Sequence, residues 1–177
     1  GSGKSIALPY LLKSTGIVQG KILVTQPRRI AARFLARQVA QLFNWELGNQ
    51  VGYQVRFDKA YTDETQIIYA TDGIILNKLI RESDFDDVEV LILDEFHERS
   101  AQIDLCLALA KKYSLSRKKK LRIIITSATL DQGSLLNYIP DAAFLELSGR
   151  SFPVEVEYNK LDERLPVWRK VVDRKST

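Results

Sequence analysis

Val90-Leu91-Ile92-Leu93-Asp94-Glu95 is the part of the sequence that indicates how this chain folds. The run over residues 88–93 is almost continuously apolar and consists mainly of valine, leucine and isoleucine, which is typical of a strand buried on both faces of a parallel sheet. Two carboxylates follow this strand directly. Because burying an unpaired carboxylate is costly, acids at this place indicate either a chemical role or a specific structural partner.

Three more runs of the same kind occur at residues 21–25, 66–70 and 121–126. Helical segments lie between them: apolar side chains recur every three or four positions in residues 28–43, and residues 100–113 form a second predicted helix, with Ser100 as its expected N-cap. Strands that alternate with helices predict an α/β domain with a mostly parallel sheet and helices on both faces. In such sheets, ligands bind at the carboxyl ends of the strands.

The chain opens with Gly1-Ser2-Gly3-Lys4-Ser5, which is the second half of the phosphate-binding pattern G-x-x-x-x-G-K-[ST]. In that pattern the loop brings backbone N–H groups close to phosphate oxygens, at the positive end of the helix that follows. Lys4 would contact the β- and γ-phosphates, and the Ser5 hydroxyl would ligate Mg²⁺. Gly-Ser at a chain start is also a common remnant of cloning, so these five residues alone leave both interpretations open.

Asp94 and Glu95 supply the other half of such a site. Asp94 would hold the Mg²⁺ of a bound nucleotide through water, and Glu95 would polarise the water that attacks the γ-phosphate. The alternative is structural: the two acids cap the next helix or pair with Arg99. His97, the only histidine, lies on the same turn, where it would face the γ-phosphate. Together with Lys4, these three residues are the candidate catalytic groups.

The string Asp94-Glu95-Phe96-His97-Glu98-Arg99-Ser100 resembles the DEAH/RHA family of superfamily 2 helicases. Phe96 in place of alanine is similar to the bacterial HrpB-type branch of that family. Five more segments follow the family's order: TQPRR at 25–29, VGYQVRF at 51–57, TDG at 71–73, SAT at 127–129 and GRSFPV at 149–154. The resemblance covers residues 1–158.

This resemblance implies a RecA-like P-loop NTPase fold. Residues 1–158 would be the first motor domain, and residues 159–177 a linker or the start of a second RecA-like domain. The implied activity is that of an ATP-dependent RNA helicase, which binds Mg²⁺ with ATP or another nucleoside triphosphate and moves along single-stranded RNA, with DNA as an alternative. The second domain of the same chain would supply arginines for hydrolysis, so the first domain alone would be nearly inactive.

The resemblance also assigns individual residues. Those implied to contact the nucleic acid are Arg28, Arg29, Thr71, Asp72 and Gly73. The hydroxyls of Ser127 and Thr129 would hydrogen-bond His97 and so link the nucleotide state to domain closure, with ordinary helix capping as the alternative. One departure concerns the family's VAQRVA segment, which reads LARQVA at 35–40. The exchange turns the arginine by about 100° around a helix, which leaves its stacking on the nucleotide base in doubt.

Several alternatives stay open at this level. Arg28 and Arg29 could form ion pairs with nearby acids, and for Arg56 an ion pair is as compatible as a contact with RNA. Two other classes of protein fit parts of the sequence. One is a P-loop ATPase that acts without nucleic acid, which would leave the PRR and TDG segments unexplained. The other is a non-catalytic nucleic-acid-binding module.

Composition sets the outer limits. The 177 residues fit one domain, and no apolar stretch approaches the ~20 residues that a membrane helix needs, so we expect no membrane partner and a cytoplasmic location. The single cysteine, Cys106, excludes an internal disulfide and favours a reducing compartment. A net charge of +4 permits an anionic partner without requiring one. The basic run at 117–120 is expected to be a solvated loop.

Overall fold

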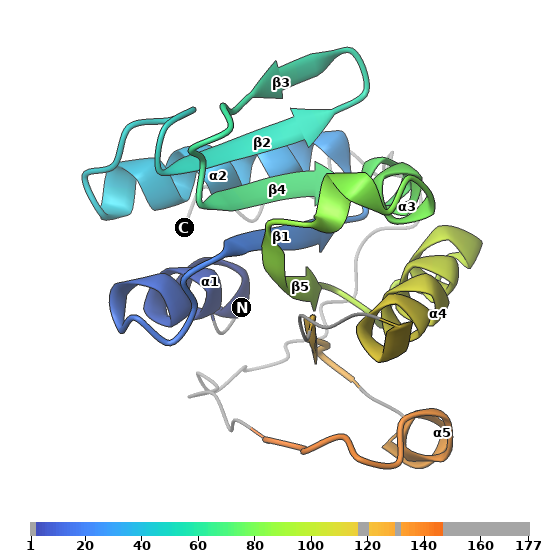
Figure 1. Ribbon diagram of the computed structural model, residues 1–177. Helices are drawn as coiled ribbons and strands as arrows, with labels where there is room; N and C mark the ends of the chain where they lie inside the picture. Colours follow the sequence, from blue (N-terminus) through green and yellow to red (C-terminus); the bar gives the residue numbers. More distant parts are fainter. Residues whose placement is uncertain (1–2, 117–120, 130–131, 147–177) are drawn as a thin grey trace, which may run out of the picture. The chain divides into compact units, whose positions relative to one another are not determined.

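A six-stranded sheet forms the centre of the computed structural model, which describes residues 3–116, 121–129 and 132–146. The strands are β1 (Lys21–Gln26), β2 (Val51–Val55), β3 (Asp58–Ala60), β4 (Ile67–Thr71), β5 (Val88–Leu93) and β6 (Arg122–Ile125). Their order in the sheet is β3-β2-β4-β1-β5-β6. Every neighbouring pair is parallel except β2 and β3, which form an antiparallel hairpin at one edge (Figure 1).

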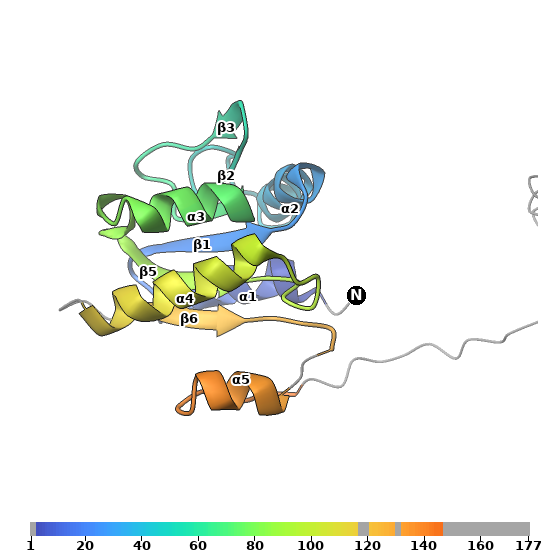
Figure 2. The ribbon, with the colours of Figure 1, turned by 90° about the vertical axis from the view of Figure 1, so that its right-hand side faces the viewer.

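Helices cover both faces of this sheet. They are α1 (Lys4–Ser14), α2 (Arg29–Leu42), α3 (Asp72–Ile80), α4 (Ala101–Ser116) and α5 (Gln132–Tyr138), with a short 3₁₀ turn at Ser83–Phe85. Figure 2 shows α3 and α4 side by side over one face, with α1 and α2 on the other. The mostly parallel α/β sheet predicted from the sequence is therefore confirmed.

Alternation along the central strands explains why the sheet needs cover on both faces. In β1, Leu23 packs with the buried side chains of α3 and α4, whereas Val24 packs with those of α2. In β5, Leu91 likewise packs with the side chains of α3 and α4, and Ile92 packs with those of α2. All four side chains are almost fully buried, so each face of the sheet carries its own apolar core.

Most elements lie where their sequence pattern placed them. The runs at 21–25, 66–70, 88–93 and 121–126 correspond to β1, β4, β5 and β6, and the helices predicted at 28–43 and 100–113 are α2 and α4. Ser100 caps α4 as expected, because its hydroxyl accepts a hydrogen bond of 3.2 Å from the Ile103 N–H. The hairpin of β2 and β3 was not predicted.

The chain divides into two compact units, Gly1–Ala142 and Ala143–Thr177. The sheet and its helices belong to the first. The predicted domain end at residue 158, the GRSFPV segment, the basic run at 117–120 and the tail at 159–177 lie outside the described residues, so these assignments stay predictions. No helix in the described part of the chain is both long and apolar enough to cross a membrane.

Candidate functional site

The carboxyl ends of four parallel strands meet along one edge of the sheet. Gln26 ends β1 in register with Thr71 at the end of β4, and Leu93 of β5 is in register with Ile125 of β6. The residues that end or follow these strands include all the candidate site residues except those of the phosphate loop, residues 1–5. The topology thus gathers segments that are far apart in the sequence.

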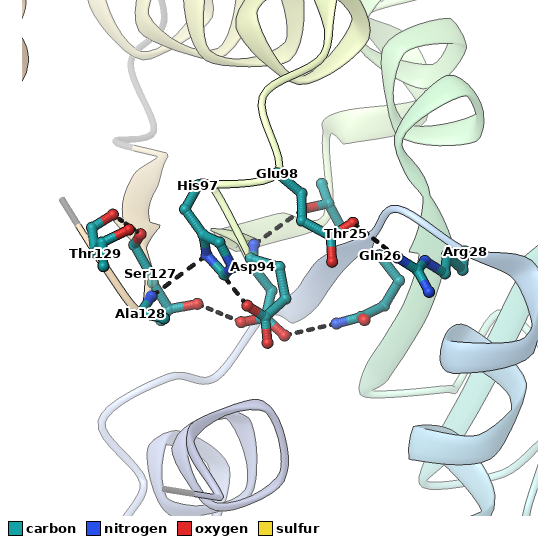
Figure 3. A network of polar contacts seen from close by, with 11 residues as sticks. Thr25, Gln26, Arg28, Asp94, His97, Glu98, Ser127, Ala128 and Thr129 are labelled. Carbon is teal, nitrogen blue, oxygen red and sulfur yellow. Dashed lines mark hydrogen bonds and ion pairs between the residues drawn. The ribbon is translucent and has the colours of Figure 1, made fainter. Parts of the chain in front are cut away.

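Asp94 is the most tightly held of these residues. Its side chain is buried, at 2% exposure, and its two carboxylate oxygens accept hydrogen bonds from different strands. The Gln26 amide donates to Oδ2 at 2.6 Å (Figure 3). The Thr126 hydroxyl donates to Oδ1. The Asp94 N–H donates to the Thr25 hydroxyl at 3.0 Å. These bonds fix the direction of the carboxylate before any ligand binds.

Glu95 follows in a backbone conformation that side-chain-bearing residues seldom adopt, with φ at 53°. Two backbone hydrogen bonds hold the turn: the Phe96 N–H donates to Thr126 O at 3.0 Å, and the Glu98 N–H donates to Glu95 O at 2.8 Å. Left-handed conformations of this kind cost roughly 1–3 kcal/mol and persist where the surroundings enforce them, often at functional sites. The turn directs the Glu95 carboxylate toward His97, whose Nδ1 lies 3.3 Å from Glu95 Oε2.

His97 also contacts the SAT segment, through the same nitrogen. The Ala128 N–H lies 3.4 Å from His97 Nδ1 (Figure 3). An imidazole nitrogen donates only when it carries a proton and accepts only when it does not, so Nδ1 cannot serve Glu95 and Ala128 in the same way at once. The Ser127 hydroxyl, which was expected to bond to His97, donates instead to the Thr129 carbonyl. The role expected for the Thr129 hydroxyl stays a prediction.

The structural alternative for the two acids does not hold. Arg99 pairs with Asp104 at 2.7 Å, and its guanidinium lies 4.9 Å from the centre of the Phe96 ring. The N-cap of the next helix is Ser100. Phe96 itself is buried at 5% exposure and packs with the apolar side chains of α3 and α4, which anchors the turn in the core.

The candidate phosphate loop leads directly into α1. Gly1 and Ser2 lie outside the described residues. Gly3 precedes the helix with φ at 65°, and a Cβ built on it would meet no atom within 4 Å. Lys4 and Ser5 are the first residues of α1, whose first turn contains no acidic residue and receives no side-chain cap. The start of this helix therefore offers backbone N–H groups and positive potential to an anion.

Pro9 explains how this loop is tied to the sheet. Proline has no N–H, so it cannot donate to the carbonyl of Ser5 four residues earlier. The Tyr69 hydroxyl of β4 takes its place and donates to Ser5 O at 2.6 Å. Burial, and secondly the negative charge of Asp94, raise the pKa of Tyr69, so its hydroxyl remains a donor. Tyr69 therefore neighbours both Ser5 and Asp94, and no local sequence pattern could have identified it.

Arg28 precedes α2 and Arg29 is the first residue of that helix, shortly after the end of β1, and both are exposed. Arg28 Nη2 lies 3.6 Å from Glu98 Oε2, so the alternative of an ion pair with a nearby acid is present for Arg28. Arg56 instead lies over the ring of Phe57, 4.7 Å from its centre. Arg37 is exposed on α2.

Asp72 differs from its expected role. The side chain is buried at 6% exposure in the first turn of α3, whereas a residue that contacts nucleic acid should be accessible. Burial raises the pKa of its carboxyl despite hydrogen bonds from its own backbone and the Ser100 hydroxyl, and the charge of Glu98 raises it further. Thr71 and Gly73 flank Asp72 and are more exposed. We therefore attribute a structural role to the Asp72 side chain.

A sheet of this order, with a helix that begins at Gly-Lys-Ser and a central strand that ends in Asp-Glu, defines a RecA-like nucleotide-binding domain. The sequence pattern of the family described as DEAD/DEAH box helicase matches residues 1–136. The chain belongs to the DEAD/DEAH box helicase family.

Individual relatives agree with this assignment. The chain is 42% identical over 164 residues to the ATP-dependent RNA helicase HrpA homolog of Haemophilus influenzae, and 40% identical over 158 residues to the ATP-dependent RNA helicase HrpB of Escherichia coli. These alignments cover 92% and 89% of the chain but only 13% and 20% of the relatives. The chain therefore spans a small part of the length of the curated relatives that it matches.

Solved structures give the same result for the fold. The crystal structure of the E. coli DEAH/RHA helicase HrpB matches 99% of this chain with a TM-score of 0.86 and 37% identity, over 22% of that protein. A second, described as the E. coli DExH-box NTPase HrpB, matches 98% of the chain with a TM-score of 0.79 and 37% identity, over 21% of its length. The RecA-like fold expected from the sequence is thus confirmed.

Proposed function

We propose that this chain is the first motor domain of an ATP-dependent RNA helicase, ending near residue 158, with residues 159–177 leading to a second RecA-like domain. One observation carries the proposal: the Tyr69 hydroxyl donates to the Ser5 carbonyl at the start of α1, and the charge of Asp94 raises the pKa of the same hydroxyl. This supports a single site that contains both halves of the nucleotide pattern. The names of the relatives, both ATP-dependent RNA helicases, support the same function.

The nucleotide binds at the start of α1. Backbone N–H groups of residues 1–5 surround the phosphates, and Lys4 contacts the β- and γ-phosphates. Asp94 fits a divalent cation, because its buried carboxylate is held by two neutral donors and no cationic side chain among the described residues pairs with it. A buried carboxylate that has only neutral hydrogen-bond donors as partners is costly unless a positive charge neutralises it. Ser5 and Asp94 hold Mg²⁺, which supplies neutralisation of phosphate charge.

Glu95 accepts a proton from the water that attacks the γ-phosphate. Its carboxylate already lies within 3.3 Å of His97, so the imidazole orients it and relays its state to the SAT segment through Ala128. Ser127 and Thr129 contribute by shaping the turn that presents this backbone N–H. Arginines of the second domain complete charge neutralisation, a contribution worth about 10³–10⁵ in rate in related NTPases.

RNA follows the same edge of the sheet. Arg28 and Arg29 contact phosphates, and the backbone N–H groups near Thr71 and Gly73 contact the next phosphates along the strand. Contacts of this type are independent of base sequence, which suits a motor that moves along a strand. They do not distinguish RNA from DNA, so a preference for RNA would rest on contacts with the 2′-hydroxyl.

The test is ATP hydrolysis by the complete protein that contains this chain, with and without single-stranded RNA. We expect RNA to stimulate phosphate release, and Glu95→Gln to reduce it by roughly a hundredfold or more, as for loss of a general base. Hydrolysis that does not respond to RNA would instead indicate an ATPase that acts without nucleic acid. Unchanged function in Glu95→Gln would indicate a non-catalytic binding module.

A further inference from the structure

Glu98 is the residue of the Asp-Glu-Phe-His-Glu segment to which no role has yet been given. Its carboxylate oxygen lies 3.6 Å from the Arg28 guanidinium, the group proposed to bind an RNA phosphate (Figure 3). Both side chains reach solvent, at 75% exposure for Arg28 and 40% for Glu98. An anion of the protein therefore occupies the position next to Arg28 that a phosphate needs.

The backbone connects this carboxylate to the catalytic turn. The Glu98 N–H donates to Glu95 O at 2.8 Å and closes the turn in which Glu95 adopts its left-handed conformation. The other end of the turn is fixed, because the Phe96 N–H bonds to Thr126 O and the Phe96 ring is buried. A displacement of Glu98 is therefore transmitted to Glu95 more readily than to the core.

The strength of the ion pair suits an exchange of partners. Exposed pairs of this length contribute about 0.2–1 kcal/mol, whereas phosphate and guanidinium form charge-assisted, often bidentate hydrogen bonds. A phosphate that reaches Arg28 can therefore displace Glu98. The negative charge of Glu98 also acts on Asp72 at the start of α3, which places Glu98 between two segments of the proposed RNA path.

We propose that Glu98 is a positioning residue, which holds Arg28 in the absence of RNA, yields it to an RNA phosphate, and in doing so signals RNA occupancy to the turn that carries Glu95. This inference rests on the proposed function, because it needs RNA at Arg28 and hydrolysis at Glu95. It assigns part of RNA stimulation to one ion pair within this domain. The size of that part is limited by the strength of the pair.

A double-mutant cycle in the complete protein tests the exchange. Affinity for a fluorescein-labelled oligouridine is measured by anisotropy in wild type, Glu98→Gln, Arg28→Gln and the double variant, with circular dichroism to verify folding. We expect Glu98→Gln to tighten binding about two- to fivefold when Arg28 is present, which corresponds to loss of a competing surface pair, and to have no effect in the Arg28→Gln background.

Hydrolysis supplies a readout that a purely structural role of Glu98 would not move. Without RNA, Glu98→Gln should raise ATP turnover, because Arg28 no longer restrains the turn through the residue 98 side chain. Turnover at saturating RNA should stay at the wild-type level. The ratio of stimulated to basal turnover then falls by about two- to fivefold. Asp104→Asn is the matched control: Asp104 is similarly exposed and pairs with Arg99 at 2.7 Å, next to the same turn, so its loss should change neither affinity nor ratio.

The outcomes separate this inference from the function on which it rests. If Glu98→Gln tightens RNA binding equally with and without Arg28, the effect comes from the change in net charge, and the proposed exchange of Arg28 between Glu98 and RNA is wrong. The same conclusion follows if Asp104→Asn also tightens RNA binding. An unchanged stimulation ratio in Glu98→Gln also contradicts it. If Arg28→Gln itself leaves RNA affinity unchanged, the proposed RNA path is wrong as well, and the exchange fails with it.

Discussion

Asp72 is a charged side chain that the fold buries, and this has a measurable cost. Burial raises the pKa of its carboxyl above the value of ~3.9 in the unfolded chain, and Oδ1 lacks a hydrogen-bond partner within the described structure. The folded state therefore holds the proton more tightly than the unfolded state. Stability falls as the pH rises from the unfolded pKa through the folded pKa, and above that window the loss stays constant.

Asp72→Asn should accordingly stabilise the protein at neutral pH. We expect a gain of roughly 1 kcal/mol in the free energy of unfolding at pH 7, because asparagine removes the buried charge, which costs more to leave without a partner than a neutral polar group does. The gain should vanish as the pH falls below ~4, where wild-type Asp72 is protonated in both states. Thermal melts across this pH range check it, with Asp63→Asn, at an exposed aspartate, as the control that should change little. A loss of stability at pH 7 would contradict the assigned cost.

At the scale of single residues, the sequence predicted the residues of the contiguous motif but not the side chains that hold them. Asp94, Glu95 and His97 were identifiable because the motif is contiguous. The partners of Asp94 were not, since Gln26 and Thr126 are 68 and 32 residues away and reach it only after β1, β5 and β6 have paired. The exposure of Asp72 was misjudged for a related reason: burial of a polar residue depends on α3 packing beside α4, which the motif does not encode.

Among the elements, the strands with continuous apolar runs were predictable, including β6 at one edge of the sheet, whereas the hairpin of β2 and β3 at the other edge was not. β1, β4 and β5 lie in the middle of the sheet and need apolar side chains on both faces, which leaves a clear pattern. β3 has three residues, none of them buried, so it has no pattern to recognise. Its position follows instead from pairing with β2 across the turn at Arg56 and Phe57.

Gly52 is the position in β2 on which this hairpin depends. A Cβ at Gly52 would lie 2.2 Å from the backbone oxygen of Ala60 and 2.8 Å from the Tyr61 Cβ, far inside contact distance. The obstacle is mainly backbone, so β3 must shift to accommodate any side chain. The glycine thus allows the chain after β3 to cross closely over β2.

Gly52→Ala should therefore destabilise the domain, by about 1–3 kcal/mol as for overpacked sites, measured as a lower midpoint in urea. Gly73→Ala is the matched comparison. The atoms nearest to a Cβ at Gly73 belong to the flexible Gln102 side chain, at 3.4 Å or more, and alanine is favoured over glycine in a helix by ~1 kcal/mol. We expect Gly73→Ala to leave stability unchanged or raise it. Equal loss in the two variants would mean that backbone crowding at Gly52 is not the cause.

Across the sheet-forming unit as a whole, the position of charge matters more than its sum. The net charge of +4 did not by itself indicate a nucleic-acid partner. What favours one is that Arg28 and Arg29 are both exposed at the carboxyl edge, beside the candidate nucleotide site. Arg122 is a useful contrast, since it begins β6 at the opposite edge, where it pairs with Glu89 at 3.4 Å and donates to Ile17 O at 3.1 Å.

Salt dependence distinguishes these two edges. Each phosphate that a protein neutralises on a single strand contributes about 0.7 to the slope of log affinity against log salt concentration. Arg28→Gln and Arg29→Gln in the complete protein should each weaken RNA binding at all base sequences and reduce the slope by about 0.7. Arg122→Gln should leave both unchanged, although it removes the same charge. A slope that falls equally in all three variants would mean that RNA responds to the total charge of the domain rather than to a path along the carboxyl edge of the sheet.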